Sequence, residues 1–342
     1  MIQSFCNELG FGNKGYSLLN LKSNPKIILI SGHNSNYKYL IKKLETNLKK
    51  KIYHYKIDDK RYSKKYVTIL SNKIKIKKPQ IMIALGGGSI IDFSKRVFAS
   101  INKNTKFYIF PSLPGSGAES SITSIINSNE KKDFLISKKF IPNGIIYDDK
   151  LINSCKHNTI LKGILDALTH CIESTLSINK NYYLNFLSIE SVNFFIKNNP
   201  IKLLGKKISN FNNINLLSFN GGLAQCNAGS GICHALSHTA EKILSESHSK
   251  CISYFILPTI KYLKIKNSRD MKKFNKQTER YIIEIIKLIK RKENFLKFNK
   301  LVSNEKTLSL LIENAQNDTC WRLYGQNVDI NLLKKILINA KH

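Results

Sequence analysis

The chain has 342 residues, of which 55 are Lys or Arg and 23 are Asp or Glu, so its formal net charge is +32. Its 42% hydrophobic and 10% aromatic residues exclude a wholly disordered chain, and its apolar runs fall short of the roughly 20 residues that cross a bilayer. The start of the chain shows no basic segment followed by an apolar one, so we expect no secretory signal.

The positive charge comes almost entirely from lysine, which is spread over the whole chain together with Asn and Ile. Arginine, the residue suited to bidentate phosphate and base contacts, is rare. This pattern indicates a solvated surface, and we expect neither nucleic acid nor a membrane as a partner. The alternative is a basic nucleic-acid-binding protein on a degenerate enzyme scaffold. Seven cysteines without a CxxC pair indicate reduced thiols and a cytoplasmic protein.

The first half of the chain alternates between two patterns. Short β-rich runs predict strands, and amphipathic segments between them predict helices. The strands are expected at 25–31, 51–57, 79–85 and 106–111, and the helices at 38–50, at 66–76 and from Ser89. Strands separated by helices form a parallel, doubly wound sheet, so we predict an α/β domain over residues 1–150.

The second half keeps a helical period with few prolines and glycines. The segments with this period are 160–176, 183–197, 214–244 and 251–265, and 281–290 is expected as a surface helix. We therefore predict an all-α domain over residues 151–342.

Two loops follow predicted strands of the first half. The glycine loop, Gly86, Gly87, Gly88 and Ser89, precedes a predicted helix, whose free N–H groups and positive dipole end suit a diphosphate. The serine loop, residues 111–121, places hydroxyls and glycines at the end of the next strand, where they would line the same crevice. The alternatives are a plain strand-to-helix turn and an ordinary polar loop.

Histidines gather in the predicted helical half. Asp166 and His170 are four residues apart and project from one helix face, and His234 and His238 repeat that spacing. His248 follows shortly after. One carboxylate with several imidazoles suits Fe²⁺ or Zn²⁺ with a position left open for substrate. His238, one turn beyond His234, is the candidate to relay a substrate proton.

Taken in order, these motifs resemble those of the iron-containing (group III) alcohol dehydrogenase family, part of the dehydroquinate synthase-like superfamily. The resemblance covers nearly the whole chain. The five matching stretches are Phe11-Gly12 for FG-x-G, 86–95 for GGGSxxDxAK, 111–119 for PTTAGTGSE, 164–173 for GxDALTHxIE and 231–238 for HAxxH.

The resemblance implies that residues 1–150 form the dinucleotide-binding domain and residues 151–342 the metal-binding, catalytic domain, and it implies a set of functional residues. The metal ligands would be Asp166, His170, His234 and His248. The dinucleotide would lie between the domains, with its diphosphate on the glycine loop, whose element includes Asp92, and with Ser112 and Ser116 in place of loop threonines.

We therefore predict a metal-dependent NAD(P)-linked alcohol dehydrogenase or aldehyde reductase. The metal, as a Lewis acid, polarises the alcohol or carbonyl oxygen while hydride passes between the carbinol carbon and the nicotinamide. We expect a small alcohol or aldehyde as substrate, favour an anionic one because of the net charge, and expect a homodimer or higher homo-oligomer.

Several positions depart from the family pattern. Ser31-Gly32-His33 stands where many members carry an Asp that reads the ribose 2′-hydroxyl, which leaves NADP open beside NAD. Ser249 replaces a Gly, and Asp133 a Lys. The segment 320–337 and the serine loop look somewhat like the branch acting on 3-deoxy-octulosonate sugar acids, and Ser31-Gly32 somewhat like phosphonoacetaldehyde reductases. Both branches stay as alternatives.

Overall fold

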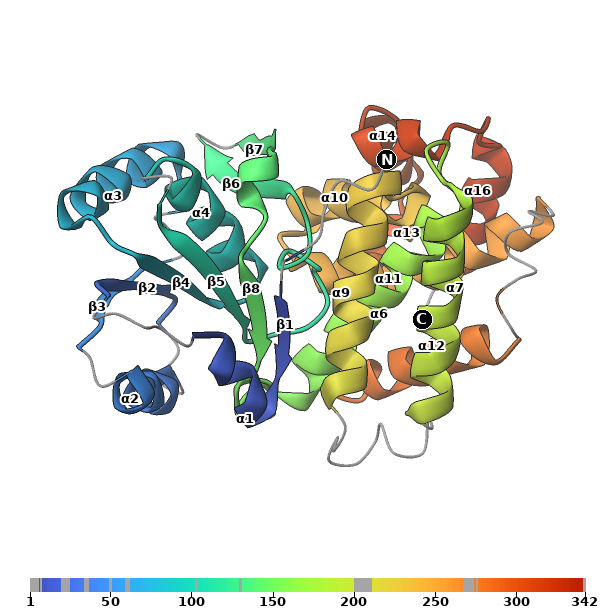
Figure 1. Cartoon of the computed structure of the whole chain (residues 1–342). Coiled ribbons are helices and arrows are strands. Elements are labelled where there is room, and N and C mark those ends of the chain that lie inside the picture. Colours follow the sequence, from blue (N-terminus) through green and yellow to red (C-terminus); the bar gives the residue numbers. More distant parts are fainter. Residues whose placement is uncertain are drawn as a thin grey trace. The chain divides into compact units, whose positions relative to one another are not determined.

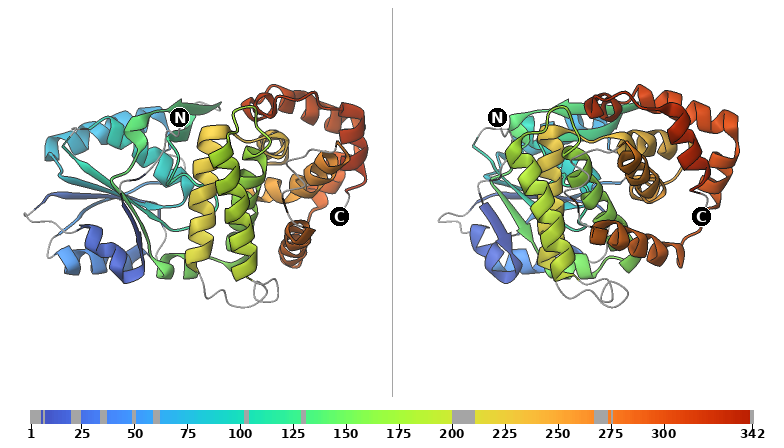
Figure 2. Two further views of the ribbon diagram at one scale, coloured as in Figure 1. Left: turned by 45° about the vertical axis from the view of Figure 1, so that its right-hand side comes forward. Right: turned by 90° about the vertical axis from the view of Figure 1, so that its right-hand side faces the viewer.

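The computed structural model describes residues 6, 8–19, 25–33, 37–48, 51–58, 62–101, 104–128, 131–199, 211–266, 274 and 276–340. Contacts divide the chain into two compact units, Met1–Lys156 and His157–His342. Figures 1 and 2 show the elements of each.

The first unit is built on a six-stranded sheet in which every neighbouring pair is parallel. The strand order is β1 (Glu8–Phe11), β8 (Gly144–Tyr147), β5 (Lys106–Pro111), β4 (Ile81–Gly86), β2 (Ile27–Ser31) and β3 (Tyr53–Lys56). β2 and β4 are buried along their whole length, as continuous apolar runs in parallel sheets usually are. The predicted α/β fold is confirmed.

Helices cover both faces of this sheet (Figure 1). α2 (Tyr37–Leu48) lies on one face with the short α1 (Gly12–Gly15), which leads into the 3₁₀ turn η1 (Tyr16–Leu19). On the other face lie α3 (Lys64–Lys77), which Ser63 caps, and α4 (Gly88–Ala99). The core between the layers is apolar and buried, with Leu40, Leu44 and Leu85 among its members.

The chain order creates a switch point in the sheet. β2 pairs with β3 on one side and with β4 on the other. The connection that follows β2 leads to β3 on one side of this pair of strands, and the connection that follows β4 leads to β5 on the opposite side. Ser31 at the end of β2 lies beside Leu85 of β4. In open α/β sheets, ligands bind outside the carboxyl ends of strands at such a point, and the glycine loop follows β4 there.

A two-stranded hairpin, β6 (Thr123–Ser128) with β7 (Lys131–Ile136), lies outside the predicted elements. Asp92 of α4 holds it: its carboxylate accepts the N–H of Ile125 at 3.0 Å and pairs with Lys95 at 3.4 Å. Lys95 is fully buried and donates to two backbone carbonyls at 2.7 and 2.8 Å. Asp133 of β7 forms ion pairs with Arg96 and, at 2.9 Å, with Lys64.

Two further elements belong to the first unit. They are the 3₁₀ turn η3 (Lys138–Phe140) and helix α5 (Asp149–Asn153).

In the second unit, every element of the described residues is a helix, as predicted. They are α6 (His157–Ser174), α7 (Tyr182–Asn198), α9 (Phe211–Ala228), α10 (Ile232–Leu244), α11 (His248–Ile265), α12 (Lys276–Lys290), α13 (Leu296–Ser303), α14 (Glu305–Gln316), α15 (Thr319–Tyr324) and α16 (Ile330–Ile338). The helical segment 214–244 is two helices, because Gly229 at φ 94° turns the chain between them. Among the described residues, no helix is long and apolar enough to cross a membrane.

Candidate functional site

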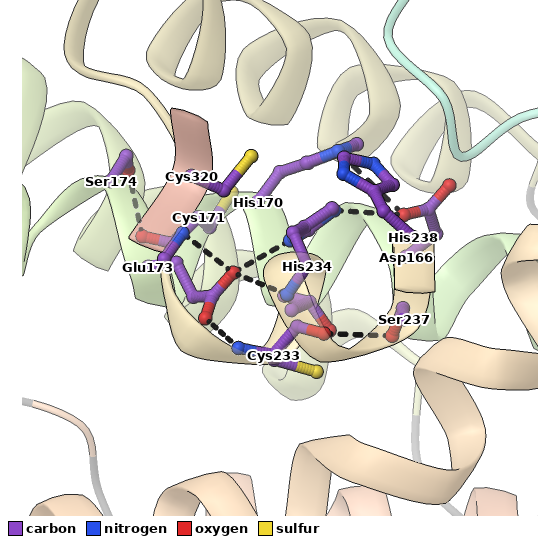
Figure 3. Close-up of polar contacts among 12 residues, drawn as sticks. Asp166, His170, Cys171, Glu173, Ser174, Cys233, His234, Ser237, His238 and Cys320 are labelled. Atoms are coloured by element: carbon purple, nitrogen blue, oxygen red, sulfur yellow. Dashed lines mark hydrogen bonds and ion pairs between the residues drawn. The ribbon is translucent and has the colours of Figure 1, made fainter. Parts of the chain in front are cut away.

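Three helices of the second unit carry the predicted metal ligands. α6 presents Asp166 and His170 from one face, because residues four apart are neighbours on a helix. His234 lies in the first turn of α10, and His248 is the first residue of α11. Both of these helices pack against α6. Four side chains separated by up to 82 positions therefore meet, and we call them the Asp166 cluster (Figure 3 labels all but His248).

The imidazoles of the cluster surround one carboxylate oxygen. Nε2 of His234 lies 3.4 Å from Oδ1 of Asp166, and Nε2 of His170 and of His248 each lie 3.6 Å from it. Ligands at about 2.0–2.2 Å from an ion in a tetrahedral site are about 3.4 Å apart. Asp166, His234 and His248 each place a donor atom within 4.8 Å of the other two. His170 is outside that triplet, although it approaches Asp166.

The polar atoms at the centre of the cluster suit a metal. Within the described part of the chain, Oδ1 of Asp166 and Nε2 of His234 are buried and make no hydrogen bond. Buried polar atoms left without partners are costly and need a reason. A borderline divalent ion takes this set of one carboxylate and imidazoles, so the residues fit Fe²⁺.

Electrostatics keep the carboxylate charged. Burial acts to raise the pKa of Asp166, but His170, His248 and His234 outweigh it and hold this pKa well below the usual range. Burial acts to lower the pKa of His248, whereas Asp166 and Glu241 raise it to about 10. The same carboxylates that hold protons on these histidines also attract a cation, so a divalent ion would compete with protons for the cluster.

Two carboxylates outside the predicted set orient the histidines. Oε2 of Glu173 lies 2.6 Å from Nδ1 of His234, and Oε1 of Glu241 lies 2.5 Å from Nδ1 of His248. An ionised carboxylate only accepts, so each Nδ1 carries a proton, and Nε2 is the nitrogen that would bind a metal in exchange for any proton it holds. This arrangement raises ligand basicity and fixes ring orientation.

The two carboxylates follow a spacing pattern in the sequence that was not among the predicted signals. Asp166, His170 and Glu173 stand at i, i+4 and i+7, and His234, His238 and Glu241 repeat that spacing. Positions at these intervals share one helix face. The glutamate at i+7 therefore lies on the same helix face as the candidate ligands at i and i+4. From there Glu173 of α6 reaches His234 of α10, and Glu241 of α10 reaches His248 of α11.

Glu173 also holds the start of α10. Its carboxylate accepts the N–H groups of Gly231 at 3.0 Å, Cys233 at 2.6 Å and His234 at 3.3 Å, which no residue of α10 itself satisfies. The fit is tight, because a Cβ on Gly231 would lie 2.9 Å from Oε1 of Glu173. One buried side chain of α6 thus fixes both the position of α10 and the ring of His234 (Figure 3).

We expect Glu173→Gln to weaken metal binding by about 10- to 100-fold, since the amide keeps the shape but loses the charge that orients His234. Chelator competition measures the dissociation constant. Glu190→Gln on α7, an exposed carboxylate of the same unit, is the control and should leave metal binding unchanged. Equal affinity of Glu173→Gln and wild type would contradict the role of Glu173.

His238 is also paired with a carboxylate. Its Nδ1 lies 3.0 Å from Oδ2 of Asp318, which precedes α15, and its ring stacks on that of His248 at 5.2 Å between centroids. Burial lowers the pKa of His238 despite Asp318. His238 also belongs to two further donor triplets, one with Glu241 and His248 and one with Asp318 and Cys320. No spacing pattern links Asp318, 80 positions away, to His238.

The cysteines near the cluster are protonated. Burial raises the pKa of Cys171 to about 12, and burial raises the pKa values of Cys233 and Cys320 well above the ordinary range. Thiols in this state are poor ligands and nucleophiles.

The glycine and serine loops come together in the first unit. The N–H of Ser112 donates to the carbonyl of Gly86 at 2.9 Å, and the Ser112 hydroxyl lies 3.0 Å from that of Tyr37. A Cβ on Gly88 would approach Oγ of Ser116 to 2.8 Å. Gly87 is the N-cap of α4, and no side chain of the described residues caps it. The first N–H groups of α4 therefore suit an anionic ligand.

Sequence models of one family match both halves of the chain. The model described as "Iron-containing alcohol dehydrogenase" matches residues 11–149, and the model of the C-terminal part of the Fe-containing alcohol dehydrogenase family matches 160–319.

Individual relatives agree with these matches. An alcohol dehydrogenase of Thermococcus barophilus is 25% identical over 284 residues, which is 74% of each chain. A probable alcohol dehydrogenase, EutG, of Salmonella typhimurium is 26% identical over 52% of this chain and 50% of its own. The solved structure of a 1,3-propanediol oxidoreductase superposes with a TM-score of 0.79 at 17% identity, over 99% of this chain and 100% of that one. The comparisons do not favour the sugar-acid branch, the phosphonoacetaldehyde branch or a nucleic-acid-binding protein.

Proposed function

Because the chain belongs to the iron-containing alcohol dehydrogenase family and is an oxidoreductase acting on CH–OH groups, we propose that the Asp166 cluster holds its catalytic Fe²⁺. The observation that carries this proposal is the convergence of three imidazole Nε2 atoms on Oδ1 of Asp166, at 3.4–3.6 Å. Among the described residues, this buried oxygen accepts no hydrogen bond, so a bound ion would offset the cost of burying its charge.

Bound Fe²⁺ supplies a Lewis acid for the substrate oxygen, and NAD(P) supplies the hydride acceptor or donor. The chain itself contributes position and proton transfer. Asp318 accepts from Nδ1 of His238, so Nε2 of that ring is the basic atom. We infer that Nε2 takes the alcohol proton during oxidation and returns it during reduction.

The glycine loop is our proposed seat for the dinucleotide diphosphate. The uncapped start of α4 offers N–H donors, and Ser112 and Ser116 flank it through their contacts with Gly86 and Gly88. The involvement of Asp92 stays a prediction, since its carboxylate is engaged by Ile125 and Lys95.

We further propose that NADP is accepted at the end of β2. Ser31 Oγ lies 2.7 Å from His54 Nε2, and His33 Nε2 lies 2.5 Å from Asp58 Oδ1. The residues that replace the family Asp thus carry a hydroxyl and an imidazole, which do not repel a 2′-phosphate as a carboxylate does, and the Asp58 carboxylate beside them is paired with His33.

Gly32→Asp should shift the ratio of kcat/KM for NADPH to that for NADH by about tenfold toward NADH, because a carboxylate there accepts the 2′-hydroxyl and repels a 2′-phosphate. A Cβ at Gly32 fits, since its nearest neighbour would be Ile90 at 3.7 Å. Steady-state kinetics with both coenzymes measure the ratio. Gly32→Asn, of the same size without the charge, should keep the wild-type ratio, and an unchanged ratio in Gly32→Asp would refute the assignment.

The net charge of +32 favours an anionic alcohol or aldehyde, since it concentrates anions near the protein. Elemental analysis of the purified protein, combined with NADH and NADPH oxidation over short aldehydes, sugar acids and phosphonoaldehydes, tests the function. One metal ion per chain and turnover of an aldehyde are expected. Absence of turnover by metal-replete protein across the whole panel would overturn the proposal.

A further inference from the structure

Three donor groups lie together beside the Asp166 cluster without belonging to it. A ring nitrogen of His238, a carboxylate oxygen of Asp318 and the sulfur of Cys320 all lie within 4.8 Å of one another. His238 is on α10, and the other two residues are at the start of α15, which packs against α10. We call these three residues the Cys320 triplet (Figure 3 labels His238 and Cys320).

The Cys320 triplet can bind an ion separately from the Asp166 cluster. The two groups have no residue in common, whereas the triplet of His238 with Glu241 and His248 contains a proposed ligand of the cluster. An ion at the Cys320 triplet therefore does not have to displace the ion of the Asp166 cluster.

The carboxylate of the triplet is held toward the imidazole. Oδ1 of Asp318 accepts the N–H of Cys320 at 2.7 Å, and Oδ2 lies 3.0 Å from Nδ1 of His238. Donor atoms around a tetrahedral ion are about 3.4 Å apart, so shifts of about an ångström bring the three donors to coordination distance. The side chains of His238 and Asp318 are 27% and 23% exposed, which gives an ion a path from solvent.

The surroundings of the Cys320 sulfur favour a cation. Burial raises the pKa of Cys320, and the negative charges of Asp318 and Glu173 raise it further, so the thiol is protonated when no ion is present. The same carboxylates attract a divalent ion, which would bind the thiolate and release the thiol proton to solvent.

A buried hydroxyl near Cys320 suits the thiolate form. Ser230 acts to lower the pKa of Cys320, and its hydroxyl makes no hydrogen bond within the part of the chain that the structure describes. This hydroxyl is therefore available to donate to a metal-bound thiolate, as groups around metal ligands commonly do.

The donor set of the triplet differs in chemistry from that of the Asp166 cluster. A thiolate, an imidazole and a carboxylate are the ligands of tetrahedral zinc sites. Zinc generally binds more tightly than Fe²⁺ at sites of this kind, and a soft thiolate increases the preference. The Asp166 cluster has no sulfur donor. The triplet therefore favours zinc.

We propose that the Cys320 triplet is an inhibitory binding site for Zn²⁺. A zinc ion on Nε2 of His238 would occupy the lone pair that accepts the substrate proton. A zinc ion on Nδ1 would leave the proton of the neutral ring on Nε2, which then could not accept another. Either way proton relay stops while the catalytic metal stays bound. The inhibition rests on the proposed function, whereas the binding of zinc does not.

Binding is tested with Co²⁺, which occupies zinc sites and absorbs in the near ultraviolet by charge transfer when a thiolate coordinates it. The probe is added to the purified full chain with its resident metal in place. Wild type should develop this absorption, and Zn²⁺ should remove it by displacing cobalt. Cys320→Ser should lack it. Cys226→Ser, which changes a partly buried cysteine of α9, is the control and should match wild type.

Inhibition is tested by adding Zn²⁺ to the aldehyde reduction assay. Cys320→Ser should keep the basal rate and raise the zinc concentration for half inhibition by about tenfold or more, since even the loss of a group that only orients a ligand costs about 10- to 100-fold. Iron content measured after desalting should be the same with and without zinc.

Three results would overturn the proposal. They are a wild type without the cobalt absorption, an absorption that Cys320→Ser leaves unchanged, and zinc inhibition that releases iron and is equal in wild type and Cys320→Ser, which would place the zinc in the Asp166 cluster. Circular dichroism checks folding. Should Cys320→Ser unfold, His238→Ala decides, because unchanged cobalt affinity without this imidazole would also refute the site. If no aldehyde is turned over, the proposed function fails, and the cobalt absorption still tests the triplet.

Discussion

His234→Ala is expected to remove bound metal and to lower kcat/KM by about a thousandfold or more, while the chain stays folded. The variant deletes the imidazole whose Nε2 lies 3.4 Å from Oδ1 of Asp166, and a site left with fewer donors binds a divalent ion weakly. Without its Lewis acid, the substrate oxygen loses several kcal/mol of transition-state stabilisation. Metal analysis and steady-state kinetics on the same preparation measure both effects.

His157→Ala is the matched control, because it removes an exposed imidazole from the start of α6. It should change neither metal content nor rate. Glu173 keeps its hydrogen bonds from the N–H groups of Gly231 and Cys233 in His234→Ala, so the start of α10 stays capped and the thermal midpoint should fall only slightly. A variant that retains full metal content would show that His234 is not a ligand.

His238→Ala is expected to keep the metal but lower kcat by about 100- to 10,000-fold, the usual contribution of a positioned general acid or base. His238 would act beside the metal without binding it, since it is not a member of the donor triplet Asp166, His234 and His248. Added imidazole should restore part of the rate. Loss of metal in His238→Ala would contradict the assignment and make His238 a ligand in one of its other donor triplets.

Asp318→Asn separates positioning from proton transfer. The amide still fills the space at the start of α15 but no longer holds the His238 tautomer by charge, so kcat should fall by less than in His238→Ala, and the metal should stay. Equal losses in the two variants would indicate that the orientation of the ring by Asp318 accounts for the whole contribution of His238.

Local sequence patterns predicted the fold class and part of the candidate site. The alternation of β-rich and amphipathic segments predicted the parallel sheet, since strands buried on both faces must be apolar throughout. The i, i+4 spacing placed Asp166 with His170, and His234 with His238, because helix geometry alone puts such residues on one face. The glycine loop was found for a similar reason: a strand, three glycines and a helix are contiguous in the chain.

Several contacts of the candidate site depend on how helices pack and could not be predicted from residue spacing. Asp318 reaches His238 only because α15 packs against α10, and Glu173 reaches His234 because α6 and α10 meet. The hairpin β6–β7 was missed because its short strands are stabilised by Asp92 and Lys95 of α4 and carry little periodicity of their own. Periodicity records which face of an element is buried, whereas the identity of the partner across that face depends on how helices pack. The sequence alone therefore determined most of the elements and which candidate metal ligands share a helix face, and the tertiary structure decided which carboxylates lie beside those histidines.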